Sequence, residues 1–446
     1  MKISIIGAGS AVFSLRLVQD LCRTPGLADS VVCLMDIDAE RLDDVHRLFA
    51  RFLQESGSRL RIEATLDRRH SLQGADFVID TAMVANYDQW RKGWDIAHRL
   101  GYRFGGSLHV MHDEAFWINF HQLNLMESIV QDMIDICPNA WLVLVANPVL
   151  AGTTYLSRTY RGVKVVGMCH GYHGIYDVAS VLGLDPEKLS FEIPGVNHFV
   201  WSNRFACDGR DVFPLLDRWI EEKSEEYFRS CPPCHPMGPK AIDLYRRFGV
   251  FPIGDTGSPG GGSWGYWYHM DRDTERKWRE DPAGWFDQYI VDGRANLSGI
   301  HRAATDPSVR ISDALPGTSG EPMIPLIEAL ACGVERTVIV NIPNSGGFVE
   351  GVPRDFEVEV PATVNARGIH GHATRKLPAP VLAFLARDRI APVELELAAF
   401  RTGRREYLVD MLLMDPWTRS VEQADELCSE ILALPFHVEM RKHFGA

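Results

Sequence analysis

Five residues whose side chains can bind a metal ion or carry protons follow two apolar, strand-like runs. VVGMCHGYHG contains Cys169, His170 and His173, and PGVNHFVW contains Asn197 and His198. In open α/β sheets, ligands bind at the carboxyl ends of the strands. One thiolate and one imidazole form an incomplete protein shell, which leaves positions for substrate oxygens and water. Cys169 and His198 are therefore candidate metal ligands; the alternative is an ordinary packed cysteine and an ordinary core histidine.

The elements that must position these residues alternate between apolar strands and helical stretches. The runs KISIIGAG, SVVCLMDID, ADFVIDTAMV, AWLVLVANPV and VKVVGMCH each have the length and composition of a buried strand. Buried strands separated by helices indicate a parallel sheet that is covered on both faces. We expect an α/β fold with a Rossmann-type, doubly wound parallel sheet over residues 1–195, as in lactate and malate dehydrogenases. Residues 196–446 are predicted to form an α+β lobe for substrate, metal and oligomer contacts.

A glycine turn after the first strand predicts a nucleotide site. Gly7, Gly9 and Ser10 stand where the first strand meets the first helix, and Asp36 ends the second strand. Glycine lets the backbone approach a pyrophosphate, which the helix N-terminus stabilises. The acid binds ribose hydroxyls and repels a 2′-phosphate, which favours NAD over NADP. The alternative is that Ser10 caps a helix and Asp36 is solvated.

Charge and composition exclude several classes of partner. The 446 residues carry a formal net charge of −13, from 46 basic and 59 acidic side chains. Such an acidic chain is unsuited to nucleic acid or anionic membranes, which require a basic face. No apolar run reaches a spanning length of roughly 20 residues, and the start MKISIIGAGS resembles a mature cytoplasmic N-terminus.

The cysteines do not form an evident framework. Their number, nine, is odd, and this favours reduced thiols over disulfides. Cys231 and Cys234 have CxxC spacing, but two prolines lie between them and no second pair exists. A structural loop is therefore predicted there in preference to a zinc or redox site.

Several short motifs together resemble a known family. GAGS followed by Phe13, VANP, CHG, GVNHF, GD and NIPN occur in this order over nearly the whole chain. The chain is similar to glycoside hydrolase family 4, whose members depend on NAD and manganese and are exceptions to two-carboxylate glycosidase chemistry. The resemblance implies oxidation at C3 of the sugar, deprotonation at C2, elimination of the aglycone, addition of water and re-reduction. It also implies NAD and Mn²⁺, or another divalent metal, as cofactors, and a homodimer or homotetramer.

The resemblance also assigns roles to individual residues. Cys169 and His198 match the family's metal ligands. Phe13 and Asn147 fall at cofactor positions, and Asn147 also lies between the cofactor and the sugar. Asn197, beside the metal histidine, is expected to face the sugar.

Further residues match the positions that carry protons in the family. Asp255 in PIGDTG lies where the base for C2 is expected, with Tyr266 and Tyr268 as alternatives and a turn-forming aspartate as the structural explanation. His170 occupies the position associated with protonation of the leaving group.

The substrate is predicted from a second segment and from the CHG motif. GYRFGGSLHVMHDEAF falls where the family contacts substrate, so Arg103, His109 and His112 are candidate sugar ligands or else solvated loop residues. CHG is similar to the branch with α-glucuronidases and α-galacturonidases, which implies an α-hexuronide glycoside with Arg103 on its carboxylate. A sulfoquinovoside and neutral α-glucosides or α-galactosides are alternatives. A 2-hydroxy-acid dehydrogenase and a non-catalytic NAD sensor are alternatives of other classes.

Overall fold

The computed structural model describes residues 1–10, 12–104, 110–111, 114–310 and 321–445, without the side chains of residues 12–16 and 260–263. Its first half is a six-stranded parallel arrangement in the order β3-β2-β1-β4-β5-β6. The strands are β1 (Lys2–Ile6), β2 (Val31–Met35), β3 (Arg61–Thr65), β4 (Phe77–Asp80), β5 (Trp141–Leu144) and β6 (Lys164–Gly167). The predicted Rossmann-type sheet is confirmed.

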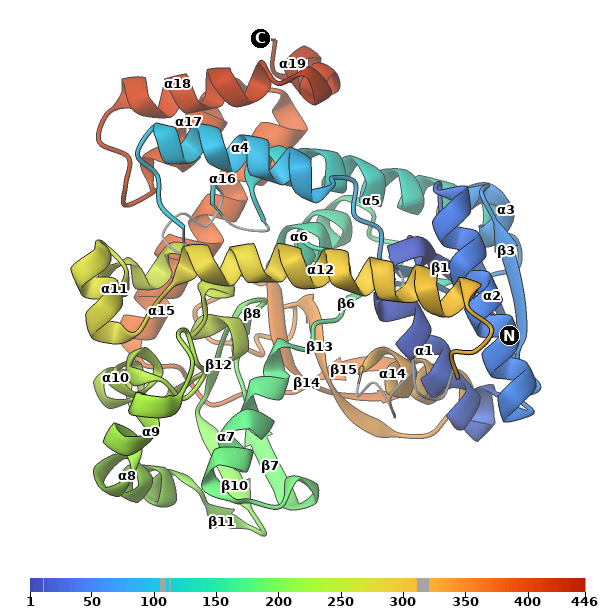
Figure 1. Ribbon diagram of the computed structural model, residues 1–446, viewed down its shortest axis with the longest axis horizontal. Helices are drawn as coiled ribbons and strands as arrows, with labels where there is room; N and C mark the ends of the chain where they lie inside the picture. Colours follow the sequence, from blue (N-terminus) through green and yellow to red (C-terminus); the bar gives the residue numbers. More distant parts are fainter. Residues whose placement is uncertain (11, 105–109, 112–113, 311–320, 446) are drawn as a thin grey trace.

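Helices cover both faces of this sheet. Figure 1 shows α5 and α6 on one side of it and α1 and α14 on the other. The helices of the first half are α1 (Val12–Arg23), α2 (Ala39–Ser56), α3 (Arg68–Leu72), α4 (Tyr87–Arg99), α5 (Phe116–Ile136) and α6 (Val149–Thr159). Strand residues such as Ile5, Val78 and Leu142 are fully buried, as expected when both faces are covered.

The second half extends the same sheet. Strand β13 (Arg336–Pro343) lies antiparallel to β6 through Asn341 and Gly167, and the described strands then continue as β14-β8-β9-β12. These strands and their neighbour β15 are β14 (Glu357–Asn365), β8 (Gly195–Val196), β9 (Phe199–Ser202), β12 (Phe251–Ile253) and β15 (Gly368–Gly371). The sheet of the first half therefore continues into the lobe predicted to begin at residue 196.

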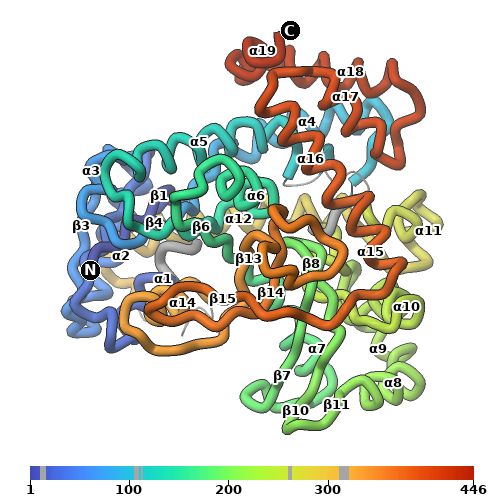
Figure 2. The backbone as a smooth tube through the Cα atoms, turned by 180° about the vertical axis from the view of Figure 1, so that it is seen from behind, coloured from blue at the N-terminus to red at the C-terminus, as the bar shows by residue number. Residues whose placement is uncertain are grey.

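A smaller sheet and the remaining helices complete the second half. The sheet contains β7 (Leu189–Glu192), β10 (Arg204–Cys207) and β11 (Arg210–Asp211). The helices are α7 (Gly174–Leu182), α8 (Phe213–Glu222), α9 (Ser224–Ser230), α10 (Pro239–Phe248), α11 (Arg272–Trp278), α12 (Pro282–Thr305), α14 (Met323–Cys332), α15 (Ala379–Leu385), α16 (Ala391–Thr402), α17 (Arg405–Leu413), α18 (Val421–Leu432) and α19 (Val438–Phe444). Figure 2 shows α17–α19 at the top of the molecule, above α5, and α16 running down from them toward α15.

Helix α12 joins the two halves. It crosses the molecule from α11 to α2 (Figure 1). Near its C-terminal end, the Arg51 guanidinium of α2 donates to the carbonyls of Ala303 (2.9 Å) and Val309 (2.7 Å).

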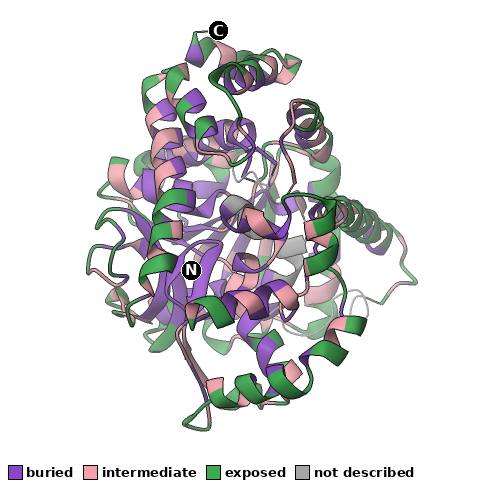
Figure 3. Ribbon diagram, turned by 90° about the vertical axis from the view of Figure 1, so that its left-hand side faces the viewer, coloured by how far each residue is buried: buried purple, intermediate pink, exposed green. Residues whose placement is uncertain are grey.

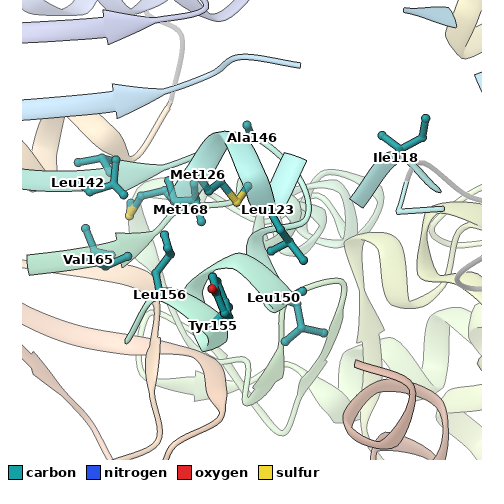
Figure 4. Close-up of a cluster of buried hydrophobic side chains, with 14 of the residues drawn as sticks. Ile118, Leu123, Met126, Leu142, Ala146, Leu150, Tyr155, Leu156, Val165 and Met168 are labelled. Atoms are coloured by element: carbon teal, nitrogen blue, oxygen red, sulfur yellow. The ribbon is translucent and has the colours of Figure 1, made fainter. Parts of the chain in front are cut away.

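The core surrounds the sheet, where buried residues are concentrated (Figure 3). Figure 4 shows part of it, in which Leu142 of β5 and Val165 of β6 lie near Leu156 of α6 and Met126 of α5. Among the described helices, none combines the length and apolar composition needed to cross a membrane. Cys231 and Cys234 follow α9 as free, buried thiols, and the Asp281 amide donates to Cys234 Sγ. This agrees with a structural loop.

Candidate active site

The turn after β1 brings together the residues predicted to bind a dinucleotide. Gly7 has φ +82°, and a Cβ there would lie 2.4 Å from Ala82 Cα, so the close approach requires glycine. The Gly9 amide donates to Asp36 Oδ2 at 2.8 Å, which places the acid beside the turn. Ser10 Oγ is buried, and no hydrogen-bond partner faces it among the described residues. Such an orphaned hydroxyl suits a phosphate oxygen.

This turn forms one wall of a cavity of 1030 Å³. Asp36 lines it with Met35, Met83 and other apolar side chains, and α12 of the second half contributes Leu297. The lining also includes the acids Asp38, Asp67 and Asp132 and the cations Arg41, Arg68 and Arg69. A glycine cradle, an apolar wall, basic side chains and an acid beside the turn together fit the chemistry of a dinucleotide. Helix α12 was not predicted as part of this site, because nothing in its sequence indicates proximity to the first strand.

A buried acid lies behind the same turn. Asp80 ends β4, is fully buried, and accepts a hydrogen bond from the Ala82 amide at 3.0 Å. Burial raises the pKa of Asp80 to about 7. The carboxyl is thus neutral in the folded protein over most of the acidic range.

The predicted metal ligands each lie near Asp255. Cys169 follows β6, and His198 occupies the turn between β8 and β9 with φ +61°. Its Nε2 lies 3.4 Å from Oδ2 of Asp255, which stands in the short helix after β12. Gly254 has φ +55°, and a Cβ there would lie 2.2 Å from the Gly171 carbonyl oxygen. This backbone contact holds the Asp255 loop against the Cys169 loop.

The surroundings of the thiol suit a cation. Burial, followed by the charges of Glu359 and Asp255, raises the pKa of Cys169 well above its ordinary value. A bound divalent ion reverses this effect and deprotonates a coordinating thiol. Asn197 is fully buried, and its Oδ1 has no donor among the described residues. In the described ranges, no group of three His, Cys, Asp or Glu side chains is placed to hold a metal ion. Cys169 and His198 stay candidate ligands.

Two glutamates that sequence reasoning missed lie behind this site. Glu357 and Glu359 of β14 are buried, and Asn197 donates to Glu357 Oε2 through its amide N–H and to Glu359 Oε2 through Nδ2, both at 3.2 Å. With its amide oriented to suit the carboxylates, Asn341 donates to both as well, at 2.7 and 3.1 Å. Burial raises the pKa of Glu359 to about 8. The sequence FEVEV offered only alternation, which is equally typical of a strand with one solvated face.

The other predicted residues have different outcomes. Asn147 is partly buried and follows β5, the strand that pairs with β6. His170 has a side chain that is 56% exposed, and its Nδ1 lies 3.6 Å from Glu321 Oε1. Arg103 donates through Nη2 to Glu275 Oε1 of α11 at 2.6 Å, so its guanidinium already has an anionic partner. His109, His112 and the side chain of Phe13 lie outside the described residues.

The three candidate bases have different surroundings. The Tyr268 hydroxyl donates to Asp243 Oδ2 at 2.6 Å, and burial with this carboxylate raises its pKa. The Tyr266 ring packs against Trp417 and beneath the Arg387 guanidinium. Asp255 keeps 30% of its side chain exposed and is held by the Ser258 hydroxyl at 3.0 Å.

The chain is similar to several known proteins over nearly its whole length. The model of the family 4 glycosyl hydrolases matches residues 2–184, and that of their C-terminal domain matches residues 193–418. An alpha-glucosidase of Erwinia rhapontici is 27% identical, with 97% of each chain covered. An alpha-galacturonidase of Lachnoclostridium phytofermentans is 24% identical over 97% of this chain and 95% of its own. A 6-phospho-alpha-glucosidase from gut microorganisms, solved with NAD and Mn²⁺, has a TM-score of 0.78 at 17% identity and covers 99% and 98% of the two chains.

Proposed function

Because this chain belongs to the family 4 glycosyl hydrolases, we propose that it is an NAD- and divalent-metal-dependent α-glycosidase that acts on an α-hexuronide. The proposed route is oxidation at C3, deprotonation at C2, elimination of the aglycone, addition of water and re-reduction. The observation that carries it is the juxtaposition of His198 Nε2 and Asp255 Oδ2 at 3.4 Å, beside the thiol of Cys169. This cluster stands on the same sheet as the glycine turn of the cofactor cavity.

The residues of the chain divide the proposed work among them. When bound, NAD⁺ supplies a hydride acceptor for C3, and a divalent cation stabilises negative charge on O2 and O3. Cys169 and His198 would hold the cation, and Asn197 would orient a sugar oxygen. Asp255 would take the C2 proton, because its carboxylate is partly exposed and faces the predicted metal ligands. His170, exposed beside the site, would donate a proton to the leaving group.

The choice of sugar rests on the named activities of the relatives and on the side chain of Arg103. Relatives include alpha-galacturonidases, which supports a hexuronide, and an alpha-glucosidase, which supports the neutral alternative. Arg103 Nε is buried without a partner among the described residues, but Glu275 occupies Nη2. A sugar carboxylate or sulfonate would therefore have to bind the remaining donors of Arg103. A cytoplasmic location and a homodimer or homotetramer are further expectations.

The activity is tested with NAD⁺, Mn²⁺ and p-nitrophenyl α-glucuronide, α-galacturonide, α-sulfoquinovoside, α-glucoside and α-galactoside. Nitrophenol release without net NADH is expected from the glycosidase, whereas a 2-hydroxy-acid dehydrogenase or a sensor would release none. A desolvated ion pair should favour the correct anionic sugar in kcat/KM by at least about tenfold, or roughly 1.4 kcal/mol. Equal turnover of the neutral glycosides would reject the anionic sugar and retain the mechanism.

The role of Asp255 is tested by solvent exchange. Reaction in D₂O should place deuterium at C2 of the released sugar. Asp255→Asn should reduce this incorporation more than it weakens substrate binding. Asp271→Asn, which replaces the acid that caps α11, should leave the incorporation unchanged. Product without deuterium at C2 would instead indicate direct displacement.

A further inference from the structure

The ring of His198 has a second contact, on the side away from Asp255. Its Nδ1 lies 3.6 Å from Oε1 of Glu114, and the Glu114 side chain is only 4% exposed. The two nitrogens of the ring therefore face different carboxylates, Nδ1 toward Glu114 and Nε2 toward Asp255. Glu114 stands 84 positions before His198 in the chain and ends no strand, so no sequence motif marked it as part of the site.

A buried arginine joins Glu114 to the backbone of the same histidine. Arg389 has a fully buried side chain; its Nη2 donates to the His198 carbonyl at 2.9 Å, and its Nη1 to Glu114 Oε2 at 3.4 Å. The two oxygens of Glu114 thus contact two different groups. The guanidinium also compensates the charge of a carboxylate that is removed from water.

Both residues of this pair are held from outside the site. The Asn119 side-chain amide donates to the Glu114 carbonyl at 2.9 Å and to Glu396 Oε1 at 2.8 Å. Arg389 lies in a π-helical turn, Ala386–Ile390, between α15 and α16. Such turns insert one residue into a helix and are frequent at functional sites. The turn from β8 to β9 is therefore fixed by contacts from the start of α5 and from the C-terminal helices.

We propose that Glu114 and Arg389 are positioning residues that prepare His198 to bind a metal ion. The negative charge of Glu114 Oε1, 3.6 Å from Nδ1, favours the tautomer with the proton on Nδ1, which leaves the Nε2 lone pair directed toward Asp255. Arg389 fixes the backbone of the turn and the carboxylate together. A carboxylate behind a ligating histidine sets its tautomer and orientation, and its loss typically weakens metal affinity about 10–100-fold. This inference rests on the proposed function, since it requires that His198 is a ligand.

The test is the Mn²⁺ dissociation constant of the full-length protein with NAD⁺, measured from the EPR signal of free Mn²⁺. Glu114→Ala should weaken binding about 10–100-fold. Glu114→Gln should retain more Mn²⁺ affinity than Glu114→Ala, because the glutamine side chain keeps an oxygen that can face Nδ1 of His198. The Mn²⁺ affinity of Arg389→Lys should lie between those of wild type and Glu114→Ala. Lysine keeps the positive charge but cannot donate to both Glu114 and the His198 carbonyl as the guanidinium does.

Glu396→Gln is the matched control. Glu396 is 4% exposed, as buried as Glu114, and accepts a hydrogen bond from Asn119 Nδ2. Glutamine keeps an oxygen acceptor for Asn119, so the Mn²⁺ affinity of Glu396→Gln should equal that of wild type. The NAD⁺ affinity and Tm of each variant report folding independently of the metal. Wild-type Mn²⁺ affinity in a folded Glu114→Ala, or no recovery in Glu114→Gln, would overturn the positioning role alone. A wild-type chain that binds no Mn²⁺ would overturn the proposed metal site as well.

Discussion

The cofactor cavity and the metal-site cluster, defined here as Cys169, Asn197, His198, Asp255 and Glu359, are built in opposite ways. The cavity has a volume of 1030 Å³, and its wall beside the first two strands is a backbone turn supported by the carboxylate of Asp36. The cluster is largely buried and combines side chains from strands or turns that lie far apart in the chain. A backbone cradle needs only a short sequence, whereas buried charges need compensation from many elements.

Removal of a predicted metal ligand should separate the two regions most clearly. Cys169→Ser and His198→Ala should each lower kcat/KM for glycoside hydrolysis by at least about 10⁴-fold, or about 5.5 kcal/mol, because charge stabilisation at the sugar is lost. The NAD⁺ dissociation constant should stay within about twofold, as the cavity is separate. EDTA should inactivate the wild type, and Mn²⁺ should restore it. Activity in either metal-free variant would contradict the metal site.

The buried acid behind the cofactor turn should control stability at neutral pH. The folded pKa of Asp80 is about 7, against 3.8 for the free side chain. Between these values the unfolded chain has lost the proton and the folded chain retains it, so stability falls from about pH 4 to pH 7 and then levels off.

Asp80→Asn keeps the acceptor for the Ala82 amide and removes this titration. Its stability relative to wild type should increase across the interval from pH 4 to 7 by on the order of 4 kcal/mol. Urea unfolding of both proteins, at intervals of half a pH unit, measures this difference in the free energy of unfolding. A difference that does not change with pH would contradict the assignment of Asp80 as a buried neutral acid.

Loss of the Asp36 carboxylate should have a smaller effect than the two changes above, and this effect should be limited to cofactor binding. Asp36→Ala removes the acceptor for ribose hydroxyls and the support of the Gly9 amide, so NAD⁺ should bind about tenfold more weakly, or roughly 1.4 kcal/mol. Discrimination against NADP⁺ should also decrease. Calorimetry measures the dissociation constants for NAD⁺ and NADP⁺. Asp43→Ala, on the exposed face of α2, is the control. A change in Mn²⁺ affinity would show that the two regions are coupled.

The smallest expected effect concerns the pair of Arg103 and Glu275. Glu275→Gln removes the anion that now competes for a partly exposed guanidinium, so kcat/KM for the preferred anionic glycoside should rise about two- to threefold, under about 1 kcal/mol. Neutral glycosides should be unaffected and provide the internal control. An equal rise for both kinds of substrate would remove Arg103 from sugar recognition.

The sequence by itself determined the parallel half of the sheet and the cofactor turn. Strand composition, the spacing of Gly7, Gly9 and Ser10, and the position of Asp36 are local features, and local backbone preferences govern them. Strand-like runs also marked Cys169 and His198. However, His198 lies in the turn of the antiparallel pair β8 and β9, to which the rule for the carboxyl ends of parallel strands does not apply.

Only the tertiary structure decided which groups surround those residues. It inserted β13 and β14 beside β6, which buried Glu357 and Glu359 behind the site. It placed Glu114 and Arg389 on His198, and it paired Arg103 with Glu275. Periodicity reports which face of an element is apolar, but the partner of a buried charge is set by elements distant in the chain, whose contacts leave no local pattern.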